Sequence, residues 1–125
     1  SKESSLKVYG DDYPTSDGTC VRDYVHVTDL AQAHLLGLDY MKNNKGFSAF
    51  NLGNGDGFSV LEVINSCQRV TDTKIPFQID GRREGDPALL VAENAYAKNL
   101  LDWNPEYDQI DSIIDSAWHW HGKGR

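Results

Sequence analysis

Short stretches rich in β-forming residues alternate with longer amphipathic stretches, and this alternation restricts the chain to folds that mix strands with helices. Strands are predicted at residues 6–9, 21–27, 49–52 and 74–79. Pro76 favours a sheet edge for the last strand, because proline has no N–H to donate to a neighbouring strand. Helices are predicted at residues 28–41, from residue 59 onward, at 94–101 and at 109–121. This order of elements predicts an α/β fold.

The predicted helices carry signals for their ends and for the faces that they bury. Thr28 is the expected N-cap of the first helix, and Ser59 with Glu62 matches the capping-box pattern at the start of the second. Apolar spacing then defines one face of each helix. In the first helix this face holds Ala31, His34, Leu35 and Leu38. In the second it holds Val60, Val63, Ile64 and Cys67, and in the last Ile110, Ile113, Ile114, Ala117 and Trp118.

Size and charge narrow the classes of function. With 125 residues, of which 39% are hydrophobic, the chain is expected to form one globular domain. Its formal net charge of −7 argues against nucleic-acid binding, because an acidic surface repels a phosphate backbone. No apolar run approaches the roughly 18 residues of a membrane span, and the polar start lacks the apolar segment of a signal peptide. We therefore expect a soluble cytoplasmic protein without a membrane partner.

The cysteines, the acidic loop and the histidines are weak candidates for a metal site. Cys20 and Cys67 lack CxxC spacing, which favours reduced thiols over a disulfide or a zinc site. The loop at residues 10–19 contains Asp11, Asp12 and Asp17, but aspartates in turns usually hydrogen-bond to nearby backbone. His119 and His121 are two positions apart, so they point in different directions on a helix. No metal ligand is predicted.

Three glycines at positions 53, 55 and 57 lie between a predicted strand and a predicted helix, where a dinucleotide-binding fingerprint would stand. The fingerprint needs a glycine three residues after Gly55, and this chain has none there. A tight turn from strand to helix is therefore the favoured interpretation. The start of the helix at Ser59 and Val60 is still a candidate contact for an anion, because free backbone N–H groups attract negative charge.

Three arginines are the strongest candidates for ligand binding. Arg22 follows the loop rich in glycine and aspartate, and Arg82 and Arg83 lie far along the chain in the glycine-flanked segment GRREGDP. Planar guanidinium groups bind phosphate oxygens in pairs, so arginines from two separate loops suit a diphosphate. The alternative is that they form surface salt bridges with the many acidic residues. Local chemistry leaves both interpretations open.

Longer motifs give the chain a family resemblance that covers nearly its whole length. They are VYGDDYPTSDGTCVRDYVHVTDLAQAH, FNLGNGDGFSVLEVI, RREGDPALLVA, LDWNPEY and IIDSAWHW. In sequence, order and spacing they resemble the C-terminal part of the UDP-glucose 4-epimerase family, within the extended short-chain dehydrogenase/reductase superfamily. The chain has neither the N-terminal glycine fingerprint nor a Tyr-x-x-x-Lys motif. The resemblance thus implies a single domain at residues 1–125, the substrate-binding portion of such an enzyme, lacking the N-terminal Rossmann domain and any catalytic residue.

The resemblance also implies roles for individual residues in binding a UDP-sugar. Arg22 and Arg83 would bind the diphosphate, while Arg82 would support the loop. Asp86 would accept hydrogen bonds from the ribose hydroxyls. Uracil would be bordered by Lys7, Val8 and Tyr9, with the Tyr9 ring packing on the base. The nucleotide pocket would be lined by Val60 and Leu90, the latter at a position where some family members carry tyrosine.

For a full-length protein, the resemblance implies interconversion of UDP-galactose and UDP-glucose through a 4-keto intermediate. NAD would be bound by the missing N-terminal domain, the enzyme would be a homodimer, and this chain alone would be inactive. Strand 49–52 would join the large sheet of that missing domain. Alternatives are a UDP-sugar 4-epimerase for arabinose/xylose or N-acetylhexosamine substrates, and a nucleotide-sugar-binding remnant without enzymatic activity. Because the keto sugar must rotate while the nucleotide stays fixed, most binding energy should come from the UDP contacts.

Overall fold

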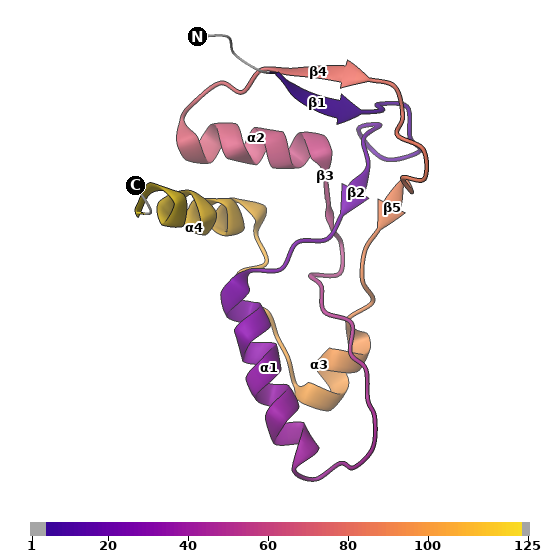
Figure 1. Ribbon diagram of the computed structural model, residues 1–125, viewed down its shortest axis with the longest axis vertical. Coiled ribbons are helices and arrows are strands. Elements are labelled where there is room, and N and C mark those ends of the chain that lie inside the picture. The colour runs from indigo at the N-terminus through magenta and orange to yellow at the C-terminus, as the bar shows by residue number, and fades with distance from the viewer. Residues whose placement is uncertain (1–4, 124–125) are drawn as a thin grey trace.

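The computed structural model describes residues 5–123 and confirms the α/β fold (Figure 1). The elements follow the chain in the order β1 (Leu6–Tyr9), β2 (Val21–Arg22), α1 (Val27–Met41), β3 (Phe58–Ser59), α2 (Val60–Thr71), β4 (Phe77–Asp80), β5 (Leu89–Leu90), α3 (Ala95–Leu101) and α4 (Ile110–Lys123). In this part of the chain, no helix is both long and apolar enough to cross a membrane.

Two small sheets lie at one end of the molecule, beside α2. In the first, β1 pairs in parallel with β4, in a register that runs from Leu6 opposite Phe77 to Tyr9 opposite Asp80. The second has the strand order β3-β2-β5, with β2 antiparallel to β3 and parallel to β5. Figure 1 shows β1 and β4 at the top, above α2, with β2 and β5 below them on the right. We call this part the pocket region. It consists of the five strands, α2 and the connecting residues 10–20, 72–76 and 81–88.

Helix α2 forms as the sequence predicts and is held against α4. Its N-cap Ser59 makes both hydrogen bonds of the capping box with Glu62. On its far side, Ser66 donates a hydrogen bond to Asp111 of α4, and the Arg69 guanidinium lies 2.8 Å from the same carboxylate. These contacts fix α4 under the helix that begins at the pocket.

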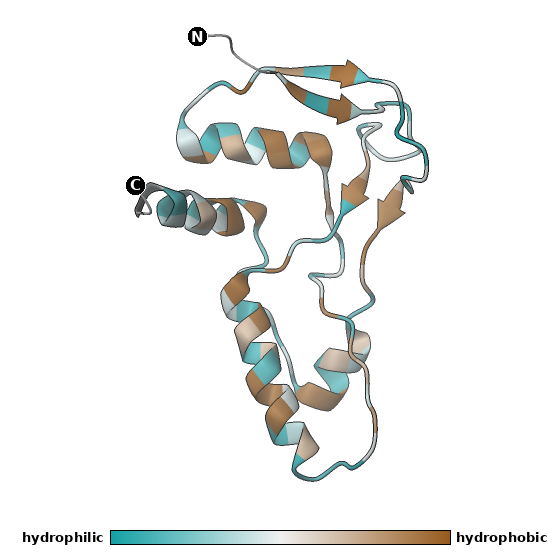
Figure 2. Ribbon diagram, viewed as in Figure 1, coloured by the Kyte–Doolittle hydropathy of each residue, from teal (hydrophilic) through white to brown (hydrophobic). Residues whose placement is uncertain are grey.

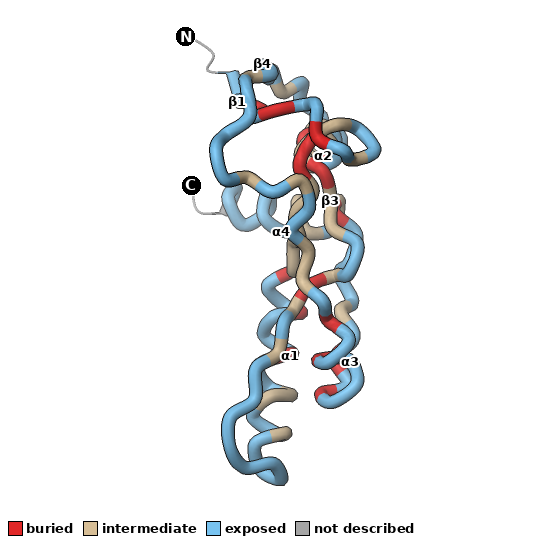
Figure 3. Tube along the Cα trace, turned by 90° about the vertical axis from the view of Figure 1, so that its right-hand side faces the viewer, coloured by how far each residue is buried: buried red, intermediate tan, exposed pale blue. Residues whose placement is uncertain are grey.

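Helices α1 and α3 form the other end of the molecule, which we call the helix region. Its core consists of Ala33, Ala97, Leu101 and Trp103. The Trp103 side chain is completely buried, and its Nε1 donates to the backbone oxygen of Asp29 at 2.9 Å. The Asp29 carboxylate in turn accepts from the backbone N–H groups of Glu106 and Tyr107. Figure 3 shows the buried positions as short stretches along a chain that is mostly exposed.

The first helix differs from its prediction at both its start and its buried face. Its N-cap is His26, whose Nδ1 accepts from the Thr28 backbone, so the prediction of Thr28 as N-cap was wrong. The face predicted to be buried is exposed, with Leu35 at 62% and Leu38 at 61% of full exposure. The opposite face packs on α3 through Ala33 and its neighbours. Figure 2 shows hydrophobic residues along the whole of α1, which explains why its apolar pattern did not identify a single buried face.

The strands also depart from prediction where side chains replace sheet hydrogen bonds. The strand predicted at 21–27 ends at Arg22, because the Asp23 carboxylate accepts the backbone N–H groups of Tyr24, Asn54 and Ala92 in place of a neighbouring strand. Residues 49–52 are not a strand, since no described strand lies beside them. The two-residue strands β3 and β5 are too short for a sequence pattern to reveal them.

Candidate nucleotide-binding site

A cavity of about 290 Å³ opens in the pocket region. Its lining contains seven of the eight predicted site residues, namely Lys7, Val8, Tyr9, Arg22, Val60, Arg83 and Asp86. These residues come from β1, β2, the first turn of α2 and the loop between β4 and β5. Residues that are far apart in the sequence thus meet around one small space.

The eighth predicted residue, Leu90, is not part of this lining. It lies in β5, where it pairs with Arg22 across the sheet, and its side chain is 60% exposed. Three further residues line the cavity that sequence reasoning did not assign: Gly10, Cys20 and Tyr24. Tyr24 had a readable signal, because it stands two positions after Arg22, and an extended chain places such residues on the same side. Burial raises the pKa of the Tyr24 hydroxyl, so it remains a neutral hydrogen-bonding group.

Strand β1 leads into a turn that needs glycine. The Val8 side chain is buried at 1% exposure, while Tyr9 is 37% exposed beside the cavity. Gly10 follows with a φ of +99°, and a Cβ there would lie 2.8 Å from the Tyr13 ring and 2.9 Å from Cγ of Arg82. The chain therefore turns at Gly10 so closely that a larger residue would displace the loop that borders the site.

The backbone N–H groups at the start of α2 already donate hydrogen bonds within the protein. The backbone N–H of Val60 donates to the oxygen of Cys20, that of Leu61 to the Thr19 hydroxyl, and that of Glu62 to the Ser59 hydroxyl. These are the amides that an anion at a helix N-terminus would use. The expectation that this helix start contacts an anion is therefore not supported, and positive charge in the cavity comes from side chains.

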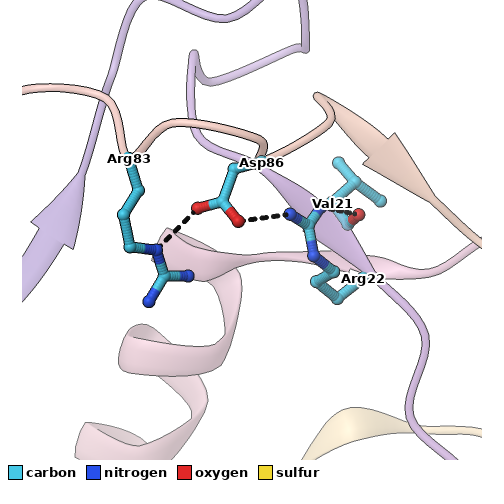
Figure 4. A network of polar contacts seen from close by, with 4 residues as sticks. All are labelled: Val21, Arg22, Arg83 and Asp86. Carbon is cyan, nitrogen blue, oxygen red and sulfur yellow. Dashed lines mark hydrogen bonds and ion pairs between the residues drawn. The ribbon is translucent and has the colours of Figure 1, made fainter.

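Two arginines converge on one carboxylate in the cavity wall (Figure 4). Nε of Arg83 donates to Oδ2 of Asp86 at 2.9 Å, and Nη2 of Arg22 lies 3.9 Å from Oδ1 of the same side chain. Nη1 of Arg22 also donates to the backbone oxygen of Val21 at 2.8 Å, which fixes its direction. The hydrogen bond to Asp86 raises the pKa of Arg83. With Lys7, the lining carries three cationic side chains against one carboxylate, in a chain whose net charge is negative.

The adjacent arginines Arg82 and Arg83 have different surroundings. Arg82 donates from Nε to Oδ1 of Asp12 at 2.8 Å and from Nη2 to the backbone oxygen of Asp12 at 2.9 Å. Its guanidinium carbon also lies 4.2 Å from the centre of the Tyr13 ring. These contacts tie Arg82 to the loop at residues 10–19, in line with the supporting role predicted for it. The guanidinium carbon of Arg83 lies 4.8 Å from the centre of the Tyr9 ring, so only Arg83 contacts the cavity lining in this way.

Among the described residues there is no cluster of three metal-ligand side chains, and the glycine turn before α2 offers no free amides at the helix start. Within residues 5–123, no three His, Cys, Asp or Glu side chains lie close enough together to bind a metal ion. The glycine turn before α2 leads to a helix start whose amides are already bonded, as described above. A pyrophosphate of NAD would find no free N–H groups there.

Comparison with known proteins shows which family the chain resembles. Residues 1–53 match the model of the NAD dependent epimerase/dehydratase family. The chain is 52% identical over 118 residues to a UDP-glucose 4-epimerase of Lacticaseibacillus casei, covering 94% of this chain and 36% of that protein. The resemblance to the C-terminal part of UDP-glucose 4-epimerases is confirmed.

Two crystal structures of UDP-glucose 4-epimerases share the fold. One aligns with a TM-score of 0.91 at 48% identity, over 97% of this chain and 37% of that protein. The other, from Bifidobacterium longum in complex with NAD+ and UDP, aligns with a TM-score of 0.86 at 43% identity, over 95% of this chain and 35% of that protein. The chain thus spans little more than a third of the length of these epimerases.

Proposed function

We propose that this chain is the UDP-sugar-binding domain of an NAD-dependent UDP-glucose 4-epimerase, and that its cavity holds the UDP part of the substrate. The observation that carries the proposal is the meeting of Arg22, Arg83 and Lys7 in one cavity with Tyr9 and Asp86. This set combines cationic groups for a diphosphate, a ring for a base and a carboxylate for ribose hydroxyls. The reaction, 4-epimerisation of UDP-glucose, is inferred from the names of the similar proteins.

The proposal assigns nucleotide binding to this chain and hydride transfer to the cofactor, because of the groups that the chain contains. In the complete enzyme, NAD would accept hydride from the sugar and return it, and the cofactor would bind outside this chain. The residues described here bind and orient the nucleotide at a distance from the reacting carbon. Such remote binding raises the rate only if it holds the substrate in the reactive orientation. The UDP cavity would therefore act as a fixed anchor around which the sugar turns.

Titration of UDP into the chain by calorimetry tests the binding role. Arg83→Ala should weaken UDP affinity by at least about tenfold, because a charge-assisted contact to the diphosphate is lost while no buried core atom is removed. Arg83→Lys should recover only part of the affinity, since an ammonium keeps the charge but not the planar fork. Arg82→Ala is the matched control and should weaken affinity less. Equal affinity of the parent and Arg83→Ala would remove the diphosphate role.

The absence of the catalytic motif from the chain gives a second test. With NAD added, the purified chain should not interconvert UDP-galactose and UDP-glucose, because it contains no Tyr-x-x-x-Lys to supply the base. An assay that couples UDP-glucose formation to its oxidation would detect turnover. Measurable turnover would show that the catalytic groups had been assigned to the wrong part of the enzyme.

A further inference from the structure

A single side chain, Arg83, contacts both groups that the proposed function assigns to the nucleoside. Its guanidinium lies over the Tyr9 ring at 4.8 Å and hydrogen-bonds to Asp86 at 2.9 Å. We propose that Arg83 occupies the groups that bind the base and the ribose, Tyr9 and Asp86, and leaves them only when its guanidinium binds a diphosphate instead. The cavity would then select nucleoside diphosphates against free nucleosides. This inference rests on the proposed function of the site.

The geometry sets the contacts of Arg83 in competition with those of a nucleoside. A base that packs on the face of Tyr9 covered by Arg83 must displace the guanidinium from the ring. A ribose that donates its hydroxyls to Asp86 must compete with the hydrogen bond from Arg83 and with the nearby Arg22. A nucleoside bound in this way displaces the guanidinium from the Tyr9 ring and competes with it for the Asp86 carboxylate.

The ligand's phosphates decide whether that exchange is favourable. A free nucleoside offers the displaced guanidinium no negative charge, so the lost ion pair is not replaced. A diphosphate gives Arg83 a new pair of anionic oxygens, and the arginine exchanges one charge-assisted contact for another. The Arg83 side chain is 62% exposed, so it can leave Tyr9 and Asp86 without disturbing a buried core. Movement of one surface side chain is sufficient, and the backbone of the loop can stay in place.

Arg82 provides a control within the same loop. It makes the same two types of contact, an ion pair with Asp12 and stacking on the Tyr13 ring, but none of these three residues lines the cavity. Its removal changes the loop charge by the same amount as removal of Arg83. Any effect specific to Arg83 must then come from its contacts with Tyr9 and Asp86.

The test compares uridine with UDP on this chain and its variants Arg83→Gln and Arg82→Gln. Ligand-observed NMR would measure the weak uridine binding, calorimetry the UDP binding, and circular dichroism the retention of the fold. Arg83→Gln should weaken UDP binding by about tenfold or more and strengthen uridine binding by about threefold or more. Arg82→Gln should change uridine binding by less than about twofold.

The opposite signs for the two ligands separate this inference from an ordinary contact role. If Arg83→Gln weakens UDP binding but leaves uridine binding unchanged, weaker or undetectable, Arg83 is a phosphate contact and does not compete with the nucleoside for Tyr9 and Asp86. An equal gain for uridine in Arg82→Gln would attribute the effect to loop charge and overturn the inference. If the parent chain binds no UDP at all, the proposed function fails and the inference fails with it.

Discussion

The pocket region and the helix region differ in the side chains that surround their cavities: charged in the first and mostly apolar in the second. The pocket region surrounds a cavity of about 290 Å³ with charged side chains, and its arginines already have partners within the chain. The helix region surrounds an apolar hollow of about 520 Å³ between α1 and residues 44–52. Nearby, Met41 and Phe47 are 68% and 94% exposed. The comparison shows that the pocket region gathers its charged side chains around one cavity, while the cluster of Ala33, Ala97, Leu101 and Trp103 forms a small core in the helix region.

Trp103 should show the largest effect, because it is the completely buried centre of the helix region. Trp103→Ala should lower the free energy of unfolding by about 3–5 kcal/mol, from lost burial and the cavity that remains. Urea denaturation would measure the change. Trp120→Ala, at a position that is 76% exposed, is the control and should have little effect. A small loss for Trp103→Ala would mean that the pocket region carries the stability.

Substitution of Asp23 should have the second-largest effect on stability, because its carboxylate connects β2 to the segments that lead into the helix region. It accepts backbone N–H groups from Tyr24, Asn54 and Ala92. Asp23→Ala would leave these groups without a partner and should reduce the free energy of unfolding by about 2 kcal/mol. Hydrogen exchange of the Asn54 and Ala92 amides would check the mechanism. If both amides stay protected in the variant, the two regions are joined by other contacts.

Asp17 should make the stability of the pocket region depend on pH. Burial raises the pKa of Asp17, but hydrogen bonds from Ser59 and Thr19 outweigh it and keep the pKa below its ordinary value of 3.8. A lowered pKa in the folded state means that this stabilisation is present above about pH 4 and is lost as the pH falls through the folded-state pKa. Because Asp17 is exposed to solvent, we expect less than about 1 kcal/mol.

The neutral variant Asp17→Asn isolates this contribution. Thermal unfolding of the parent chain and the variant should differ at pH 6, and the difference should shrink as the pH falls below about 4. A difference that stays constant across this range would show that the charge of Asp17 is unimportant.

Leu38 should have the smallest effect, since it lies on the exposed face of α1. Leu38→Asp should change the free energy of unfolding by no more than about 0.5 kcal/mol, as for other surface substitutions. The same change should reduce binding of a dye that fluoresces on apolar surfaces. A loss of several kcal/mol would mean that this face is covered, for example by a second copy of the chain, and would remove the contrast between the two regions.

The features that the sequence predicted well are those that depend on local chemistry. The capping box at Ser59 and Glu62 uses side chains three positions apart, so it formed as predicted. Strand β1 and helix α3 also lie within a residue of their predicted bounds. Seven predicted site residues line one cavity, but those assignments came from the family resemblance, since no local pattern brings Lys7 near Arg83.

The errors arose where long-range contacts decide the structure. Thr28 has the right chemistry for an N-cap, yet the preceding His26 takes the role with its ring buried against Ser116 and Tyr107. The early end of β2 depends on Asp23 bonding to residues 54 and 92, which no local window contains. The contacts between Arg83, Tyr9 and Asp86 likewise require the folded positions of β1 and the loop after β4.

The parallel pairing of β1 with β4 has a consequence for how the molecule folds. Leu6 pairs with Phe77 and Tyr9 with Asp80, so the chain must close a loop of about seventy residues before this ladder forms. Contacts of such high sequence separation form slowly compared with helices, whose hydrogen bonds are local. We therefore expect α1 and α2 to form early in refolding and the cavity to form in the final step. During synthesis on the ribosome, the ligand-binding site would not exist until the loop after β4 had emerged.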